Sequence, residues 1–427
     1  MIDLKRLRQD PEGSRASLLR RRDPALPGLL DELLVLDRRR RDILGRVEAI
    51  KAERNAASEE VARRKRSGES ADDLLARLKV SGEEVKQFDS ELREVDALLE
   101  LTALSVPNFP LDGLPDGDAA ANRVVRTWGE PPQFDFAAKP HWELGAALGI
   151  LDLPAGAKIT GSGFPLLRGH GARLIRALAA FMIDLHTREH GYEEIAPPYL
   201  VNRATATGTG QLPKFEDDLY SLPTDDLFLI PTAEVPVTNI HRDEILDGSA
   251  LPKGYVAYTP CFRREAGAHG KDTRGLIRVH QFDKVELVRL SRPEDSPAEH
   301  ELMTRHAETV LQRLGIPYRV VELAAGDIGF GSARTYDLEV WAAGVNTWLE
   351  ASSSTTFTDF QARRANIRFR PEPKAKPEFV HTLNASGVAF PRTIIALLEN
   401  NQAADGSVRV PEALVPYLGV DRLAPGA

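Results

Sequence analysis

Apolar residues recur with a heptad spacing between residues 30 and 100. One seam of this pattern passes through Leu33, Leu36, Arg40, Ile43, Val47, Ile50, Arg54, Ala57 and Val61. A second passes through Leu74, Leu78, Ser81, Val85, Phe88, Leu92, Val95 and Leu99. The residues between them, Arg66–Ser70, include Gly68 and suit a chain reversal. The two seams therefore predict an antiparallel two-helix coiled coil, with arms about 50 Å long at 1.5 Å per residue.

Beyond residue 105 the helical pattern stops. Residues 106–133 are rich in proline and glycine and are expected to form a linker. Residues 134–427 mix helical stretches with short β-branched runs at 255–258, 276–279, 285–290, 318–323 and 338–341. Strand runs with helices set apart predict an α+β domain with a mainly antiparallel sheet. We therefore expect a helical arm (1–105), a linker and this second domain.

Charge is distributed unevenly along the 427 residues. The whole chain has 55 Lys and Arg against 63 Asp and Glu, a net charge of −8, but residues 1–105 contain 22 of each and are neutral. Basic residues nevertheless gather along the arm, at Arg38, Arg39, Arg41, Arg46, Lys51, Arg54, Arg63, Arg64 and Lys65. Such a stripe is typical of a surface that follows a phosphate backbone. A solvated coiled-coil face is the alternative.

The cysteine content excludes disulfide-stabilised folds and one kind of zinc site. Cys261 is the single cysteine, so the chain has no internal disulfide framework and no zinc site built on paired thiolates. We expect a cytoplasmic protein without zinc. The N-terminus has no apolar signal region, and the most apolar stretch is interrupted by Arg176 and Asp184, so no membrane association is expected.

Three short segments carry candidate chemistry. In the first, a charged loop between two strand-like runs would gather cations around a polyanion: Arg263, Arg264, Lys271, Arg274 and Arg278. An ordinary charged β-hairpin is the alternative. In the second, Glu350 and Ser353 offer a carboxylate and a hydroxyl at a strand end, which suits Mg²⁺ that bridges phosphates. A serine-rich turn is the alternative.

The third segment begins a helix. Pro391 fits the first helical position, and Arg392 would then lie at the end of the helix that attracts anions. Arg392 could also be an ordinary surface cation. Taken together, the three segments point to a site for a phosphorylated substrate.

These segments resemble known motifs in their order along the chain. Phe262-Arg263-x-Glu265 and the run from Arg278 to Glu286 resemble motif 2 of class II aminoacyl-tRNA synthetases. The helix with Arg392 resembles motif 3. Residues 191–198 resemble motif 1, and a predicted amphipathic helix through Leu174, Leu178, Phe181 and Leu185 precedes them. Segments 208–215, 232–234 and 359–364, together with the arm, extend the resemblance to bacterial seryl-tRNA synthetases over residues 1–420.

This resemblance implies a two-step reaction. L-serine and ATP would form seryl-adenylate, and the seryl group would pass to the 3′ end of tRNA(Ser), and of tRNA(Sec) where present. Positioning and charge neutralisation dominate such phosphoryl chemistry, so the implied catalytic residues are Arg263, Glu350 and Arg392. The implied ATP-binding residues are Arg263, Arg264, Glu265, Val279, Phe282, Glu350, Ala351, Ser352, Ser353 and Arg392. Glu350 and Ser353 would bind Mg²⁺.

The resemblance also implies a serine pocket. Its residues would be Thr232, Ala233, Glu234, Arg263, Glu286, Asn384 and Ser386. Buried polar groups aimed at a hydroxyl would reject alanine. Asn384 could instead cap a turn, and Thr232 could only order a strand end. We interpret His280 as a structural histidine and assign no nucleophilic role to Cys261.

Finally, the resemblance implies a homodimer with Pro198 at the interface. The chain departs from the common family pattern at Leu349, Ser354, Thr356 and Pro391. Two alternatives remain: an inactive synthetase-like protein that binds nucleic acid, and an amino-acid activator that loads a carrier protein.

Overall fold

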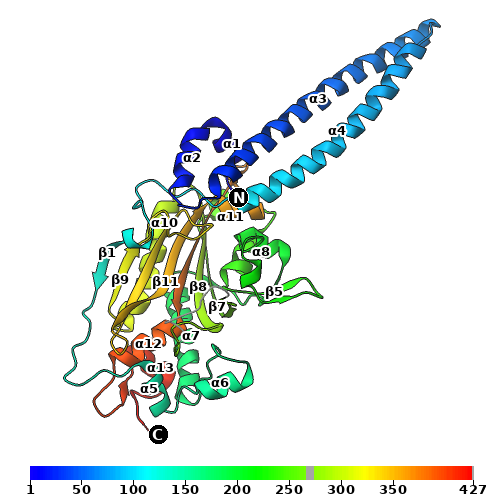
Figure 1. The fold of residues 1–427 in the computed structure, drawn as a ribbon. Coiled ribbons are helices and arrows are strands. Elements are labelled where there is room, and N and C mark those ends of the chain that lie inside the picture. The colour runs from blue at the N-terminus through cyan, green and yellow to red at the C-terminus, as the bar shows by residue number, and fades with distance from the viewer. Residues whose placement is uncertain (266–273, 426–427) are drawn as a thin grey trace. The chain divides into compact units, whose positions relative to one another are not determined.

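The computed structural model describes residues 1–265 and 274–425. These residues form two compact units (Figure 1). One unit comprises Ile2–Leu19 and Asp23–Pro107. The other comprises Met1, Arg20–Arg22 and Asn108–Ala427. Among the described residues, no helix combines the length and the apolar composition that a membrane crossing requires.

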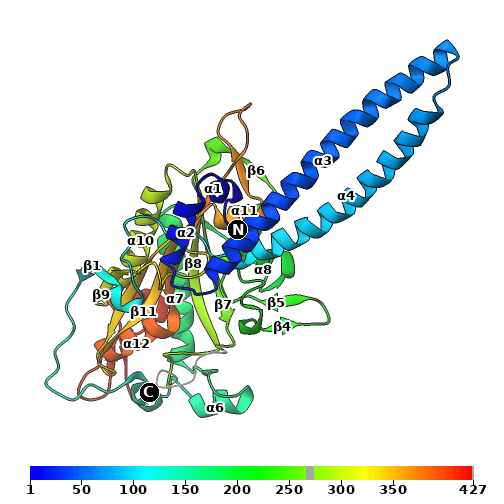
Figure 2. The ribbon, with the colours of Figure 1, turned by 45° about the horizontal axis from the view of Figure 1, so that its top comes forward.

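The first unit is the predicted coiled coil. Its helices are α1 (Leu4–Gln9), α2 (Pro11–Leu19), α3 (Leu26–Ser67) and α4 (Asp72–Ser105), and α3 and α4 run side by side in opposite directions (Figures 1 and 2). Seam residues such as Leu33, Val47 and Val85 are buried, which confirms the heptad interpretation. Gly68 ends α3 in the left-handed conformation, with φ of +75°.

A polar interruption of the first seam has a partner across the coiled coil. Arg40 Nε donates to Asp96 Oδ1 on α4 at 2.6 Å. The ion pair therefore allows an arginine at a seam position, because its charge is compensated where the two helices face each other.

The second unit is built on a sheet of eight strands within the described residues. In spatial order they are β1 (Arg123–Trp128), β9 (Tyr318–Glu322), β10 (Arg334–Ala342), β11 (Thr347–Thr358), β14 (His381–Ala389), β8 (Gln281–Ser291), β7 (Lys253–Phe262) and β2 (Glu193–Glu194). All neighbours are antiparallel except β2 and β7. The predicted α+β class with a mainly antiparallel sheet is confirmed.

Two sequence expectations differ from the structure in this unit. Residues 276–279 were expected to form a strand but form turns and bends. Gly275 has φ of +68°, and the next amide, Leu276 N, donates to His141 Nε2 at 2.9 Å instead of joining a ladder. Within the expected linker 106–133, Arg123–Trp128 form the edge strand β1, which pairs with β9.

The two faces of the sheet differ in chemistry. Leu338, Ala385 and Leu287 point to the face that packs against α7 (His170–Arg188), α10 (Ser296–Arg313) and α12 (Phe390–Asn400) in one apolar core. Because side chains alternate along a strand, their neighbours Asp337 and Glu286 point to the opposite face. The sheet thus places polar side chains on the face away from these helices.

Smaller elements surround this core. The remaining helices are α5 (His141–Ala147), α6 (Leu153–Ile159), α8 (Arg203–Thr209), α9 (Glu234–Thr238), α11 (Phe360–Ala365) and α13 (Val415–Leu418). The remaining strands are β3 (Leu200–Asn202), β4 (Ser221–Leu222), β5 (Leu227–Leu229), β6 (Ile245–Asp247), β12 (Arg368–Arg370), β13 (Glu378–Phe379), β15 (Val408–Arg409) and β16 (Arg422–Leu423).

A buried carboxylate anchors α12. Glu399 Oε1 accepts from the backbone N and the Nδ1 of His141, both at 2.8 Å. Its Oε2 accepts from Gly344 N at 2.7 Å and Val345 N at 3.1 Å. Since Nε2 of the same His141 accepts from Leu276 N, one chain of hydrogen bonds joins α12 to the segment before β8.

Replacing Glu399 with alanine should lower the stability of this unit substantially. The change leaves buried donors without acceptors, at about 1–3 kcal/mol for each, so we expect a loss of at least about 3 kcal/mol. Differential scanning calorimetry measures the shift in Tm, and Glu412→Ala, an exposed carboxylate, is the control. An unchanged Tm for Glu399→Ala would contradict the anchoring role.

Candidate active site

Two adjoining cavities lie in the second unit. The larger is about 720 Å³ and the smaller about 220 Å³. Arg263, Glu265 and Arg278 line both of them. Thr232 and Glu234 line only the larger cavity. The smaller is also lined by Val279, Phe282, Lys284, Glu350, Ala351, Ser386 and Arg392. The structure therefore brings most of the predicted site residues to two connected spaces.

The hairpin of β7 and β8 holds Arg263 at its end. The last ladder pair is Phe262 with Gln281, and the next amide, Arg263 N, donates to His280 O at 2.9 Å. His280 N donates to Gly163 O at 2.8 Å, and a Cβ at Gly163 would lie 2.4 Å from the His280 ring. His280 is therefore packed and hydrogen-bonded at the base of the loop, which supports its structural interpretation.

The cations predicted in the loop differ in their position relative to the cavities. Arg263 has its guanidinium 5.2 Å from the Phe282 ring centroid, and Arg278 Nη1 pairs with Glu265 Oε2 at 2.5 Å. Arg264 lies 5.9 Å from the Tyr220 ring, and Arg274 lies 4.4 Å from the Trp142 ring. Neither Arg264 nor Arg274 lines either cavity. Lys271 lies outside the described residues.

The first turn of α12 contributes Arg392 to the smaller cavity. Its Nη1 donates to Glu350 O at 2.6 Å and lies 3.5 Å from Glu350 Oε2, while its Nε donates to Ile277 O at 3.3 Å. The helix begins at Phe390, so Pro391 occupies its second position and not the first as predicted. Arg392 is thus a positioned cation, and the interpretation of it as an ordinary surface cation does not fit.

A bulge brings Glu350 and Ser353 to one face of β11. Residues three apart on a regular strand point to opposite faces. Here Glu350 is paired with Glu339, and Ser353 with Asp337, because the register shifts between Leu338 and Glu339. Glu339 and Asp337 are two residues apart, so all four side chains share a face. Both residues lie inside β11, so the predicted position at a strand end is wrong, and so is the alternative of a serine-rich turn.

The other residues of this segment point elsewhere. Ser352 is buried, and its hydroxyl donates to Ser386 O at 2.5 Å. Ser352 and Ser353 line neither cavity, whereas Ala351 lines the smaller one. Any role of Ser352 toward a nucleotide would therefore involve its backbone.

Asp337 is a site residue that sequence reasoning missed. Burial, with the charge of Glu350 nearby, raises the pKa of Asp337 well above its usual range. Its Oδ1 has no hydrogen-bond partner among the described residues. An acidic residue inside a buried strand was the available signal, but only the cross-strand pairing places it opposite Ser353.

The face of β10 and β11 that holds Asp337, Glu339 and Glu350 is rich in carboxylates and suits a hard cation. No group of three or more His, Cys, Asp or Glu side chains in residues 1–265 and 274–425 could hold a metal ion. A cation beside Glu350, Ser353 and Asp337 would therefore need further ligands. Mg²⁺ fits this chemistry because it keeps several waters and takes phosphate oxygens as ligands.

Thr232, Lys284 and Glu286 form a buried cluster, in which Thr232 lines the larger cavity, Lys284 lines the smaller one and Glu286 lines neither. Lys284 Nζ donates to Thr232 Oγ1 at 2.9 Å and forms an ion pair with Glu286. Thr232 Oγ1 donates to Glu286 Oε2 at 3.3 Å, and Glu286 Oε1 has no partner among the described residues. Lys284 was not assigned to the site from the sequence, although it lies two residues before Glu286 and so shares its face of β8.

Glu234 opens α9 next to this cluster. Burial and the neighbouring charge of Glu286 together raise the pKa of Glu234 to about 7, against the opposing effects of Gln361, Lys284 and Arg263. Gln361 Nε2 donates to Glu234 Oε1 at 2.6 Å. The two carboxylates thus lie close enough to affect each other and would both be stabilised by an added positive charge.

Of the other predicted pocket residues, Ser386 lines a cavity, whereas Asn384 and Ala233 do not. Ser386 lines the smaller cavity and lies opposite Glu286 in the sheet. Asn384, on the same strand, is half-buried and lines neither cavity. Ala233 is buried in an apolar cluster with Tyr255 and Val288. Cys261 is also buried, and burial raises the pKa of its thiol, which does not favour a nucleophilic thiolate.

The basic residues of the coiled coil fall into two groups. Several are paired with carboxylates of the same unit: Arg39 with Glu91, Arg41 with Asp37, Arg63 with Glu60, and Arg64 with Glu60 and Asp73. Arg46 lies 6.0 Å from the Phe88 ring, and Arg54 is half-buried. Arg38, Lys51 and Lys65 are exposed and form no ion pair within the described part of the chain.

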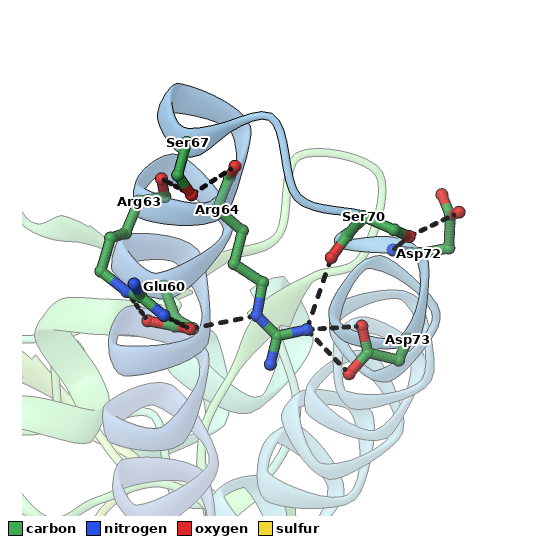
Figure 3. A network of polar contacts seen from close by, with 7 residues as sticks. All are labelled: Glu60, Arg63, Arg64, Ser67, Ser70, Asp72 and Asp73. Atoms are coloured by element: carbon green, nitrogen blue, oxygen red, sulfur yellow. Dashed lines mark hydrogen bonds and ion pairs between the residues drawn. The ribbon is translucent and has the colours of Figure 1, made fainter.

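Figure 3 shows that Arg64 joins the two helices at the tip. Its Nη1 donates to Asp73 Oδ1 at 3.1 Å on α4 and reaches Ser70 O at 3.5 Å in the turn. Its Nε donates to Glu60 Oε1 on α3, also at 3.1 Å. Arg64 therefore holds the turn together, and its charge is compensated locally.

Comparison with protein families matches both parts of the chain. Residues 1–110 match the family described as Seryl-tRNA synthetase N-terminal domain. Residues 214–401 match the family described as tRNA synthetase class II core domain (G, H, P, S and T). The chain is 56% identical over 420 residues to Serine–tRNA ligase of Gemmatimonas aurantiaca, covering 98% of this chain and 99% of that protein. It is 53% identical over 424 residues to Serine–tRNA ligase of Carboxydothermus hydrogenoformans, with 99% of each covered.

Solved structures show the same similarity. Seryl-tRNA synthetase from Pyrococcus horikoshii complexed with ATP has a TM-score of 0.96 and 38% identity, with 100% of both chains covered. Cytoplasmic serine–tRNA ligase from Naegleria fowleri in complex with AMP has a TM-score of 0.87 and 29% identity, with 98% of this chain and 96% of that chain covered.

The carboxyl group of Glu234 should titrate near pH 7. In Glu286→Gln its pKa should fall, because the neighbouring negative charge that favours the protonated form is removed. Carbon-detected NMR of side-chain carboxyls measures both values, with Glu234→Gln identifying the signal. An ordinary glutamate pKa for Glu234, or no response to Glu286→Gln, would contradict the described burial and proximity.

Proposed function

The chain belongs to the seryl-tRNA synthetase family and is a serine–tRNA ligase; from that membership we propose how its residues divide the reaction. ATP binds in the smaller cavity and L-serine in the larger one. The observation that carries this proposal is the position of Arg263, which lines both cavities. One guanidinium can then contact the α-phosphate of ATP and the serine carboxylate that attacks it, and so bring the two reactants together.

The nucleotide is held by groups of the smaller cavity. Phe282 stacks on the adenine, Glu265 accepts from its amino group, and the backbone near Val279 completes the contact. Arg392 binds the triphosphate from the first turn of α12, where the helix end adds to the attraction for anions. ATP as the substrate is supported by the solved ATP complex of the Pyrococcus horikoshii relative.

Mg²⁺ would be held by Glu350 and Ser353, which share a face of β11, with Asp337 behind them. When bound it neutralises negative charge on the phosphates. The unpartnered Asp337 Oδ1 supports a cation at this position. Of these three side chains, Glu350 lines the smaller cavity, together with Arg392 and Arg263.

Serine recognition uses the buried polar cluster. Glu234 and Glu286 attract the serine ammonium, and Thr232 and Glu286 offer hydrogen bonds to its polar groups. Ser386 would add a hydrogen bond from the wall of the smaller cavity. The unpartnered Glu286 Oε1 supports this assignment, because a buried carboxylate oxygen gains most from a new donor. Alanine lacks the hydroxyl and would leave such groups unpaired, which gives discrimination.

The acceptor is tRNA(Ser), and the coiled coil binds it. Arg38, Lys51 and Lys65 are the foremost contacts, because they are exposed and carry no competing ion pair in the described residues. Arg39, Arg41, Arg63 and Arg64 would each have to exchange a carboxylate for a phosphate. The protein acts in the cytoplasm as a homodimer, with the exposed Pro198 at the interface. Where tRNA(Sec) is present, the protein also charges it with serine.

The sequence is also compatible with two other functions. An inactive synthetase-like protein would not need Arg263, Glu265 and Arg392 gathered around one cavity, so their arrangement favours catalysis. An activator that loads a carrier protein would not need the arm, which matches the N-terminal domain of seryl-tRNA synthetases. Both observations favour tRNA charging.

Replacing Glu286 with glutamine should impair serine activation. The change keeps the size of the side chain but removes a buried charge, so kcat/KM for serine should fall by about 2 kcal/mol of transition-state stabilisation, or about 30-fold. Serine-dependent ATP–pyrophosphate exchange measures this. The exposed Glu412→Gln is the control, and unchanged kinetics of Glu286→Gln would refute the pocket assignment.

Replacing Arg38, Lys51 and Lys65 together with alanine should weaken tRNA binding. Each lost phosphate contact should reduce the slope of log K against log salt by about 0.7–0.9. Filter binding at several salt concentrations measures affinity and slope, while ATP–pyrophosphate exchange should be unchanged. Lys374→Ala with Lys376→Ala, both exposed in the second unit, is the control. An unaltered slope in the triple variant would exclude these side chains as phosphate contacts.

A further inference from the structure

Gln361 lies in α11 and connects three segments of the serine side of the site. Its Nε2 donates to Glu234 Oε1 at 2.6 Å and to Thr209 O at 3.3 Å. Its Oε1 accepts from Thr382 Oγ1 at 2.7 Å. Gln361, Glu234 and Thr382 are all buried. A single amide thus joins the first residue of α9, the last residue of α8 and the strand β14.

We propose that Gln361 is a positioning residue that holds the Glu234 carboxylate in the orientation that receives the ammonium group of serine. This inference rests on the proposed function, since it assigns a role within the serine pocket. Gln361 itself lines neither cavity, so it acts through Glu234. It is therefore expected to affect serine binding and not the chemistry at the phosphate.

Thr382 determines which end of the amide faces Glu234. A carboxylate accepts hydrogen bonds only, so it must face the NH₂ end of Gln361. The Thr382 hydroxyl donates to the oxygen end and stabilises that same orientation. If the amide were reversed, its oxygen would face the carboxylate and two acceptors would repel each other.

The amide also stabilises the charged form of Glu234. Burial and the charge of Glu286 raise the pKa of Glu234, while the hydrogen bond from Gln361 and the charges of Lys284 and Arg263 lower it. Among the described residues, Gln361 is the side chain that hydrogen-bonds to this carboxylate. Without it, Glu234 would be protonated over a wider pH range and would bind an ammonium group less well.

The second bond of the amide links Glu234 to the cavity wall. Thr209 ends α8, and Thr209, Gly210 and Gln211 line the larger cavity. Through Thr382 the same amide reaches β14, two residues before Asn384. The orientation of Glu234 is therefore tied to the backbone that shapes the pocket, which explains why a buried glutamine is placed here.

The test compares Gln361→Leu and Thr382→Val in the full-length protein. Steady-state ATP–pyrophosphate exchange gives kcat and KM for serine on both sides of pH 7, and KM for ATP is measured in parallel. In the wild type, KM for serine should rise as the pH falls below about 7, because Glu234 becomes protonated. Gln402→Leu is the control, since Gln402 is a buried glutamine that bonds to Lys139 and Glu399 away from Glu234.

In Gln361→Leu, KM for serine near neutral pH should increase about tenfold, and the midpoint of its pH dependence should move upward by about one unit. Raising the pH should restore much of the affinity, while kcat and KM for ATP change less than about threefold. Thr382→Val, which keeps its shape, should show the same changes to a smaller extent and remains informative if Gln361→Leu does not fold. Gln402→Leu should keep the wild-type midpoint.

Other outcomes would overturn the inference. If the pH midpoint for serine stays at its wild-type value in both Gln361→Leu and Thr382→Val, Gln361 does not act through Glu234. If kcat and both KM values change together without a shift in midpoint, the role is structural. If the wild type itself shows no serine-dependent exchange, the proposed function fails, which is a separate result from failure of the positioning role.

Discussion

Two carboxylates, Glu234 and Glu286, are buried side by side in the second unit, and the structure around them has to compensate for their charge. Lys284 and Arg263 supply part of that compensation. It is incomplete, because Glu286 Oε1 has no partner in the described residues and the pKa of Glu234 remains raised. In the proposed serine pocket, the ammonium group and the hydroxyl of serine would supply what is lacking. The ligand would then stabilise the pocket, which is a physical basis for selecting a small amino acid that can also donate through its side chain.

The sheet makes this arrangement possible and extends it to the phosphate side. Strand alternation turns Glu286 away from the helix-covered face, and the bulge in β11 returns Glu350 to the same face as Ser353. Arg392 then meets Glu350 from the first turn of α12, whose other end is anchored through Glu399. Cations and carboxylates therefore both line the smaller cavity, and Arg263 lines both cavities. This is the arrangement that an acyl-phosphate-forming enzyme needs, because charge must be neutralised while reactants are held in line.

Periodic features could be predicted from the sequence, and features that depend on tertiary pairing could not. The heptad seams predicted the coiled coil because burial repeats locally, and the order of short motifs predicted the family and several residues that line the two cavities, among them Arg263, Glu265 and Arg392. The β-branched run at 276–279 wrongly predicted a strand, because the Leu276 amide donates its hydrogen bond to His141 Nε2. Asp337 was missed since its partner Ser353 is set by strand register, and the bond between Gln361 and Glu234 joins residues far apart in sequence. Lys284 was missed although it lies two residues before Glu286 on the same strand. Likewise, the sequence does not show that Arg64 forms ion pairs with Glu60 and Asp73 (Figure 3).

We propose that the charge-deficient cluster around Glu234 and Glu286 selects serine for activation beside the nucleotide cavity. Arg263 lines both cavities and can therefore contact serine and ATP together. The most direct test is amino-acid-dependent ATP–pyrophosphate exchange with the full-length protein and each of the twenty amino acids. We expect exchange with serine well above that with every other amino acid, including alanine and threonine. Exchange that does not depend on serine, or that alanine supports equally well, would contradict it.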